Sequence, residues 1–307
     1  MPQYLDPKND LTFKRVFGEH KHLCMSLINS MLPLDYPVVS IEYQTGELIP
    51  ELVDVLRNTI VDVRCTDSEG RQFLVEMQLN WSEVFKSRVL LNASKAFVLQ
   101  LDKAQDIELL KPVYSLNFVN KTFEKDQDME NEYLHHYKIV NIKHTNKQIK
   151  GLEFLFVELP KFKPLNRAEK KLHELWLRFL TEVDENTEII PDDLLENELI
   201  REAVRHMEKA AYTKEQLKAY DKFKIDSLTA AAMLNEAEKK GKEQGIELGK
   251  EQGIEIGKEQ GEKINQMKTI ENGVKKGYAI EIIADITGLT TTEIIKIIEE
   301  IKETNSS

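Results

Sequence analysis

Apolar residues recur at helical spacing through the first thirty residues of the chain. They are Phe13, Val16, Phe17, Leu23, Leu27 and Met31. Spacing of three and four residues places these side chains on one face and predicts a single amphipathic helix. Either Asn9 or Asp10 can cap its start, and Pro33 ends it.

The following segments have the pattern of strands, with alternation or many β-branched residues. They are residues 38–43, 59–65, 71–79, 113–119, 133–142 and 152–159. Because the turn Asp67-Ser68-Glu69-Gly70 separates two of them, residues 59–79 are expected to form a β-hairpin. Between these strands, residues 82–101 carry apolar side chains every four positions, which predicts a helix.

The order of these elements is helix, strand, hairpin, helix and then further strands, which is typical of a mixed α/β architecture. We expect this α/β core to cover residues 1–164, because prolines at 160 and 164 end the pattern. An all-helical C-terminal region follows. It is expected to comprise a helical region at 165–234, a glycine-spaced charged linker at 235–268 and a small helix-turn-helix-like tail at 269–307.

Six glycines recur every four residues from Gly241 to Gly261. Each glycine weakens a helix by about 1 kcal/mol relative to alanine, although this spacing keeps the glycines on one face. One interpretation is close helix–helix contact between chains, which would make a homo-oligomer through the C-terminal helices. A solvated helical spacer is the favoured interpretation. The tail carries Lys296 at the centre of its second helix and no arginine, so docking or oligomerisation fits it at least as well as base recognition.

Charge and composition narrow the classes of function. The net charge of −11 argues against a surface coated with basic residues, although it leaves room for a local basic groove. The two cysteines, Cys24 and Cys65, form no CxxC motif, so neither a zinc site nor a disulfide framework is indicated. The sequence has no signal-like segment and no apolar run of membrane-spanning length, so we expect a cytoplasmic protein without a membrane partner.

Two acidic residues fall inside the expected hairpin. Asp62 lies between Val61 and Val63, while Glu76 and Gln78 share one face of the facing strand. Charged residues are depleted at such positions and two facing carboxylates repel, so a divalent cation such as Mg²⁺ is a natural resolution. Asp62 and Glu76 would be ligands, together with the backbone carbonyl of Met77. The alternative is that both carboxylates lie on the solvated face of an antiparallel sheet.

The helix at 82–101 offers cations beside these acids. Arg88, Asn92 and Lys95 are expected to share a face opposite the apolar stripe, where they could bind DNA phosphates. An ordinary solvated polar face explains the same pattern equally well.

Three segments carry a family resemblance. They are N-D-L-T-F-K-R-V-F-G at 9–18, I-V-D-V-R at 60–64 and V-E-M-Q-L at 75–79. They resemble the recombination-promoting nuclease (Rpn)/transposase family of the PD-(D/E)XK nuclease superfamily. The resemblance implies a restriction-endonuclease-like fold and Mg²⁺-dependent cleavage of DNA. It gives Asp62 the role of the first acid, Glu76 that of the second, and leaves Gln78 where the superfamily has lysine.

The glutamine changes the expected chemistry, because it can position a water molecule but supplies no positive charge. That charge would have to come from Lys14, Lys86, Arg88 or Lys95. Asp10 either caps the first helix or is a supporting acid near the metal. The expected function is that of a metal-dependent DNA endonuclease, a hydrolase that cuts phosphodiester bonds and promotes DNA recombination. The alternative is a DNA-binding or assembly protein with a degenerate, weak or inactive nuclease core.

Overall fold

The computed structural model describes residues 3–44, 47–48, 59–60, 62–101, 107–124, 127–164 and 171–304. Val61, which was part of the expected hairpin, lies outside these residues, as does the start of the expected helical region at 165–170. The chain forms two compact units, Met1–Ala231 and Ala232–Ser307, and each is described by itself.

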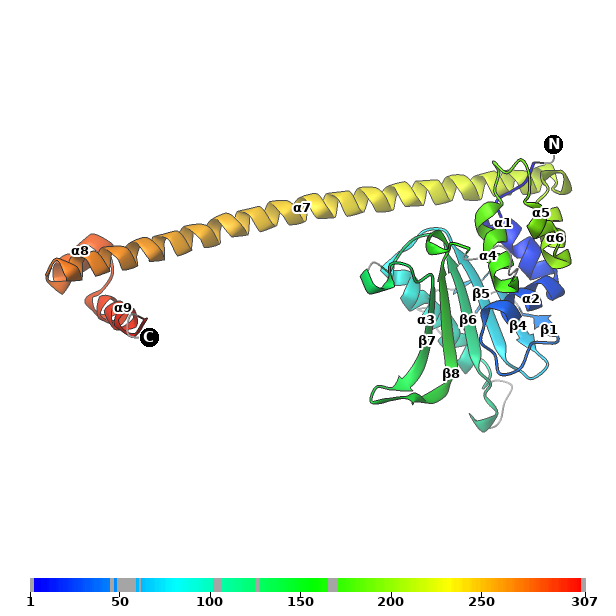
Figure 1. Ribbon diagram of the computed structural model, residues 1–307, viewed down its shortest axis with the longest axis horizontal. Helices are drawn as coiled ribbons and strands as arrows, with labels where there is room; N and C mark the ends of the chain where they lie inside the picture. Colours follow the sequence, from blue (N-terminus) through cyan, green and yellow to red (C-terminus); the bar gives the residue numbers. More distant parts are fainter. Residues whose placement is uncertain are drawn as a thin grey trace. The chain divides into compact units, whose positions relative to one another are not determined.

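The first unit is built on a six-stranded mixed sheet in the order β1-β4-β5-β6-β8-β7 (Figure 1). Its strands are β1 (Ile41–Tyr43), β4 (Val63–Asp67), β5 (Gln72–Gln78), β6 (Val113–Val119), β7 (Leu134–Asn141) and β8 (His144–Glu158). β4 and β5 form the antiparallel hairpin that the sequence predicts. β5, β6 and β8 are parallel neighbours, and β7 returns antiparallel to β8.

The strand expected over residues 59–65 is split, so that expectation was wrong. β3 (Thr59–Ile60) pairs with β2 (Glu47–Leu48) in a separate two-stranded sheet. The chain must therefore leave one ladder before it joins the next, and it bends at Asp62 before β4 begins at Val63.

The single helix expected at the N-terminus is also interrupted. It consists of α1 (Asp10–Phe13), a π-helical turn η1 (Lys14–Gly18) and α2 (Lys21–Met31). The side chain of His20 lies in the break, and its Nδ1 is 2.8 Å from the carbonyl oxygen of Arg15. This contact occupies a carbonyl group at a helix end, where partners within the helix are missing.

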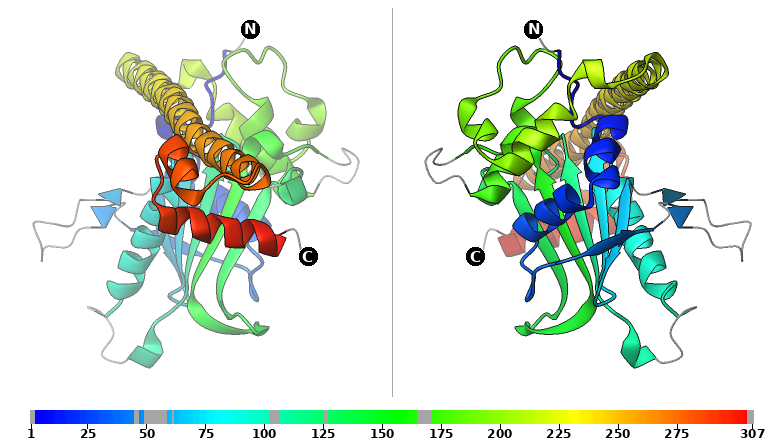
Figure 2. Two further views of the ribbon diagram at one scale, coloured as in Figure 1. Left: turned by 90° about the vertical axis from the view of Figure 1, so that its left-hand side faces the viewer. Right: turned by 90° about the vertical axis from the view of Figure 1, so that its right-hand side faces the viewer.

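Helices cover both faces of the sheet (Figure 2). On one face lies α3 (Glu83–Val98), which buries Phe85, Val89 and Ala93 of the predicted stripe. The other face carries α2 together with α4 (Leu172–Glu182), α5 (Asp192–Leu195) and α6 (Glu198–Arg205). Short 3-10 turns complete the unit: η2 (Ile107–Leu109), η3 (Gln127–Met129), η4 (Leu159–Lys161) and η5 (Lys209–Ala211).

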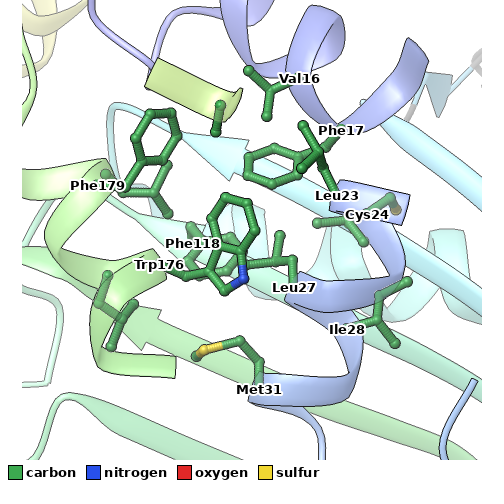
Figure 3. Close-up of a cluster of buried hydrophobic side chains, with 14 of the residues drawn as sticks. Val16, Phe17, Leu23, Cys24, Leu27, Ile28, Met31, Phe118, Trp176 and Phe179 are labelled. Carbon is green, nitrogen blue, oxygen red and sulfur yellow. The ribbon is translucent and has the colours of Figure 1, made fainter. Parts of the chain in front are cut away.

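The largest hydrophobic cluster joins the sheet to the helices that follow it in sequence. Trp176 and Phe179 of α4 pack with Phe17 and Leu27 from the N-terminal helices and with Phe118 of β6 (Figure 3). Because one core contains both segments, the boundary expected near residue 164 does not separate two compact units.

The C-terminal part is helical, as predicted. α7 (Lys214–Lys275) runs through the glycine repeat, and its start is capped reciprocally by Thr213 and Gln216. In the second unit, the end of α7 packs with α8 (Ile280–Thr287) and α9 (Thr291–Thr304) through Ile270, Ile283 and Ile294. Among the described residues, no helix is both long enough and apolar enough to span a bilayer.

Candidate functional site

Asp62 is fixed at the bend that precedes β4. Its Oδ2 accepts a hydrogen bond from the backbone N–H of Met77, with an oxygen–nitrogen distance of 2.7 Å. Its Oδ1 lies 3.8 Å from Nζ of Lys14. Since Val63 pairs with Val75 in the hairpin, Asp62 stands beside Glu76 in the next register position. The structure therefore brings together the two acids that the sequence singles out, although Asp62 is not within a strand.

Glu76 is only 4% exposed and lies under α3. Its Oε1 accepts a hydrogen bond from Nδ2 of Asn92 at 3.0 Å, and its Oε2 lies 3.7 Å from a guanidinium nitrogen of Arg88. The alternative in which both carboxylates lie on a solvated face is therefore wrong. The sheet is mixed, and helix α3 covers the face that Glu76 occupies.

Burial makes both carboxylates hard to ionise. Burial raises the pKa of Asp62 to about 7, and the nearby charge of Glu76 adds to that rise, while the Met77 hydrogen bond and Lys14 oppose it. Burial also raises the pKa of Glu76, against the opposing effects of Asn92 and Arg88. Two buried acids that disfavour each other's charge form a site that a cation would stabilise.

The donor atoms around this acid pair suit a hard divalent cation, which prefers oxygen ligands. The Met77 carbonyl is a suitable third donor. In an extended strand the N–H and C=O of one residue point to the same side, and the Met77 N–H points at Asp62. The described residues hold no group of three or more acidic, histidine or cysteine side chains arranged for a metal. A cation here would thus need backbone and water oxygens as well as the two acids.

Gln78 connects the acid pair to helix α3. Its Oε1 accepts a hydrogen bond of 2.6 Å from Arg88, and its Nε2 donates one of 2.6 Å to the carbonyl of Asn80. Arg88 therefore reaches both Glu76 and Gln78. Of the four candidate cations, it is Arg88 that the structure places at the glutamine position.

The other candidate cations are placed differently. Lys14 forms an ion pair of 2.6 Å with Asp10 in addition to its longer contact with Asp62. Lys86 lies over aromatic rings, with its Nζ 5.4 Å from the ring centre of Trp81. Lys95 lies in the last turn of α3, seven residues beyond Arg88.

The start of α1 decides between the two caps that the sequence leaves open, Asn9 and Asp10. Asn9 is the cap, because its side chain accepts a hydrogen bond from the N–H of Leu11. Asp10 is not the cap; it lies in the first turn, pairs with Lys14, and its charge contributes to the raised pKa of Asp62.

Asn92 does not lie on an exposed polar face, so the phosphate contact expected of it was wrong. It is fully buried, and its amide group is directed at Glu76. At 100° per residue, position 92 falls beside Phe85 at the edge of the apolar stripe and not opposite to it. Its Oδ1 is buried without a hydrogen-bond partner among the described residues.

The sequence prediction missed the aromatic residues next to the acid pair. Trp81 and Phe123 stack with ring centres 4.1 Å apart, just beyond the ends of β5 and β6. Their position in the sequence could have indicated them. Trp81 follows β5, the strand that carries Glu76 and Gln78, and therefore lies at the same edge of the sheet as the candidate acids.

The comparisons with known proteins agree with this architecture. The family model described as PD-(D/E)XK nuclease family transposase matches residues 7–237. Neither a curated protein nor a solved structure matches the chain. The matched region contains the mixed sheet, its flanking helices and the acid pair, which together form a restriction-endonuclease-like fold. The chain belongs to the PD-(D/E)XK nuclease family transposases.

Proposed function

We propose that this protein is a metal-dependent DNA endonuclease that hydrolyses phosphodiester bonds. The observation that carries the proposal is the buried acid pair Asp62 and Glu76, with Arg88 within reach of Glu76 and Gln78. Burying two carboxylates together is destabilising unless a cation compensates their charge. Acids with such perturbed pKa values cluster at functional sites, and the chain belongs to a nuclease family.

Asp62, Glu76 and the carbonyl of Met77 would hold Mg²⁺ or another divalent cation. When bound, such a cation polarises a phosphodiester and lowers the pKa of a bound water molecule. The Met77 N–H orients the Asp62 carboxylate, and Asn92 orients that of Glu76.

Arg88 supplies the positive charge that stabilises the phosphate oxygens as negative charge develops on them. Gln78 then acts as a positioning residue, because both ends of its amide are already engaged, with Arg88 and with Asn80. Lys14, Lys86 and Lys95 are proposed to bind phosphates on either side of the cut. Promotion of DNA recombination is part of the proposal, since strand exchange can start from a cut.

The test is the conversion of supercoiled plasmid to the nicked form by the full chain, in Mg²⁺ and in EDTA. We expect cleavage in Mg²⁺ alone, and we expect Glu76→Gln to lose it while keeping a cooperative unfolding transition. Cleavage that persists in EDTA, or in Glu76→Gln, would contradict the proposed role of the acid pair.

A second candidate is a DNA-binding or assembly protein with a degenerate core. It is favoured by Gln78 at the lysine position and by the lack of a three-residue metal cluster among the described side chains. It predicts a gel-mobility shift without cleavage in any divalent metal, and a shift that Asp62→Asn leaves unchanged.

A further inference from the structure

An aromatic cluster extends the candidate site along the edge of the sheet. Trp81 and Phe123 are stacked at an interplanar angle of 14°, and Phe85 of α3 meets Trp81 edge to face at 5.7 Å. Arg88 lies over the Phe85 ring at 4.9 Å while it contacts Glu76 and Gln78. The aromatic cluster is thus joined to the acid pair by a single arginine.

The outer part of this cluster has the composition of a base-stacking surface. Phe85 is buried, whereas Trp81 and Phe123 are each partly exposed. Nζ of Lys86 lies 5.4 Å from the Trp81 ring centre and 5.0 Å from that of Phe123. Surfaces that bind single strands combine aromatic rings for the bases with cations for the backbone.

The region around Leu79 and Asn80, just beyond the end of β5, is unsuited to a phosphate backbone. A cavity of about 360 Å³ there is lined by Asn80 and by three acids, Asp6, Asp184 and Glu185. Its one lysine, Lys224, is already paired with Glu185. Because the acids outnumber the cation, this cavity disfavours a nucleic-acid backbone.

We propose that Trp81, supported by Phe123 and Lys86, stacks an unpaired base next to the phosphate that is cut, so that the substrate is single-stranded or locally unpaired DNA. This inference rests on the proposed nuclease function. In an intact duplex each base face is covered by its neighbours, and a base reaches a protein ring only after it has left the stack. Duplex DNA therefore gains less from this surface than a single strand does.

The fluorescence of Trp81 itself can be used to measure this contact. It has two tryptophans, and the other, Trp176, is fully buried in the main core. Binding of dT20 to the full-length protein in EDTA, where no cutting is expected, should quench the Trp81 fluorescence. A 20-base-pair duplex should quench it much less.

Affinity is measured in parallel by the anisotropy of a labelled dT20. Stacking of one base on an aromatic ring is lost in Trp81→Leu, which should weaken binding between about fivefold and about a hundredfold. Trp81→Phe should retain most of the affinity. The matched control is Tyr36→Leu: its side chain is exposed, and its carbonyl contacts Arg71, just before β5 and about 20 Å along the strand from Gln78.

Unchanged dT20 affinity in a folded Trp81→Leu protein, or equal quenching by duplex and single strand, would overturn the inference. An equal loss in Tyr36→Leu would overturn it too. A different result would contradict the proposed nuclease function, namely the absence of plasmid cleavage in Mg²⁺ and other divalent metals. Stacking without cleavage would indicate a protein that binds single strands and does not cut them. Cleavage without stacking would indicate a nuclease with another substrate preference.

Discussion

One hydrogen bond and one bend in the chain determine the position of the Asp62 carboxylate. The bend takes it out of the sheet ladder, and the Met77 N–H holds its carboxylate next to Glu76, close to Lys14. Lys14, the one lysine near Asp62 in the described part of the chain, is already paired with Asp10, so it cannot fully compensate the cost of burying the charge.

This arrangement predicts a pH dependence of stability in the metal-free protein. Because the folded-state pKa of Asp62 is raised to about 7, from an ordinary value of about 4, the folded state holds that proton more tightly than the unfolded state does. The free energy of unfolding should therefore fall as the pH rises between these two values. Asp62→Asn should reduce this fall, leaving the part that comes from the raised pKa of Glu76, and should be the more stable protein at pH 8 in EDTA.

Urea denaturation at pH 5 and pH 8 measures this difference. Mg²⁺ should reverse the order at pH 8, because only the wild-type protein has the carboxylate that binds the cation. Parallel pH profiles for the two proteins would show that Asp62 is not a strained, buried acid.

The charge on Arg88 gives a second prediction at this scale. Arg88→Gln should lower the rate of plasmid cleavage by about a hundredfold, since one preorganised donor to the developing charge is lost. Adding Gln78→Lys to that variant should restore part of the rate, because it returns a cation to the same place. Arg205→Gln, a change at an exposed arginine of α6, is the control. An undiminished rate in Arg88→Gln would exclude the proposed role.

At the scale of elements, sequence periodicity predicted the helices, strands and turns that depend on residues within one segment. The helix α3, the hairpin β4–β5 and the strand β6 all follow from spacing and turn residues within one segment. These features placed Asp62, Glu76 and Gln78 close together correctly.

What the sequence could not predict depends on contacts between distant segments. The split between β3 and β4 follows from the pairing of β3 with β2, and the break before α2 involves the His20 side chain. Asn92 differs in part, because helical spacing alone places it beside Phe85 at the edge of the apolar stripe. Only its contact with Glu76 joins distant segments. None of these contacts leaves a periodic signal in the chain.

The glycines of α7 fall into two environments, which gives an element-scale prediction. A Cβ added at Gly257 would meet nothing within 4 Å, whereas one at Gly273 would lie 2.9 Å from Cγ1 of the buried Ile283. Gly257→Ala should therefore stabilise the helix by up to about 1 kcal/mol, through better helix propensity. Gly273→Ala should destabilise the packing of α8 on α7.

Thermal unfolding followed by circular dichroism at 222 nm compares the two variants directly. Each is the same glycine-to-alanine change within one helix, so each serves as the control for the other. Stabilisation of equal size in both would contradict the close approach at Gly273.

At the scale of the whole molecule, the family match and the compact unit nearly coincide. The match ends at residue 237, and the first unit ends at Ala231. One hydrophobic cluster runs from the N-terminal helices through the sheet to α6, so helices α4 to α6 belong to the nuclease fold and are not an appended region.

This organisation predicts where proteases cut first. Side chains from 235 to 262 are exposed on all sides of α7, and glycine lowers the local cost of opening the helix. Limited trypsin digestion should therefore cut within 235–268 and leave a resistant fragment that retains α4 to α6. Mass spectrometry of early products checks this, and first cuts between 171 and 231 would contradict a single core.

The buried acid pair is proposed to cut DNA with the help of a divalent cation. The most direct test is the initial rate of supercoiled plasmid nicking against Mg²⁺ concentration for the wild-type protein and Asp62→Asn. Asp128→Asn, the same change at an exposed position in η3, serves as the control. We expect saturable, Mg²⁺-dependent nicking by the wild type and by Asp128→Asn, and a loss of at least about a hundredfold in Asp62→Asn. Equal nicking by folded Asp62→Asn protein would contradict the proposed role of the acid pair.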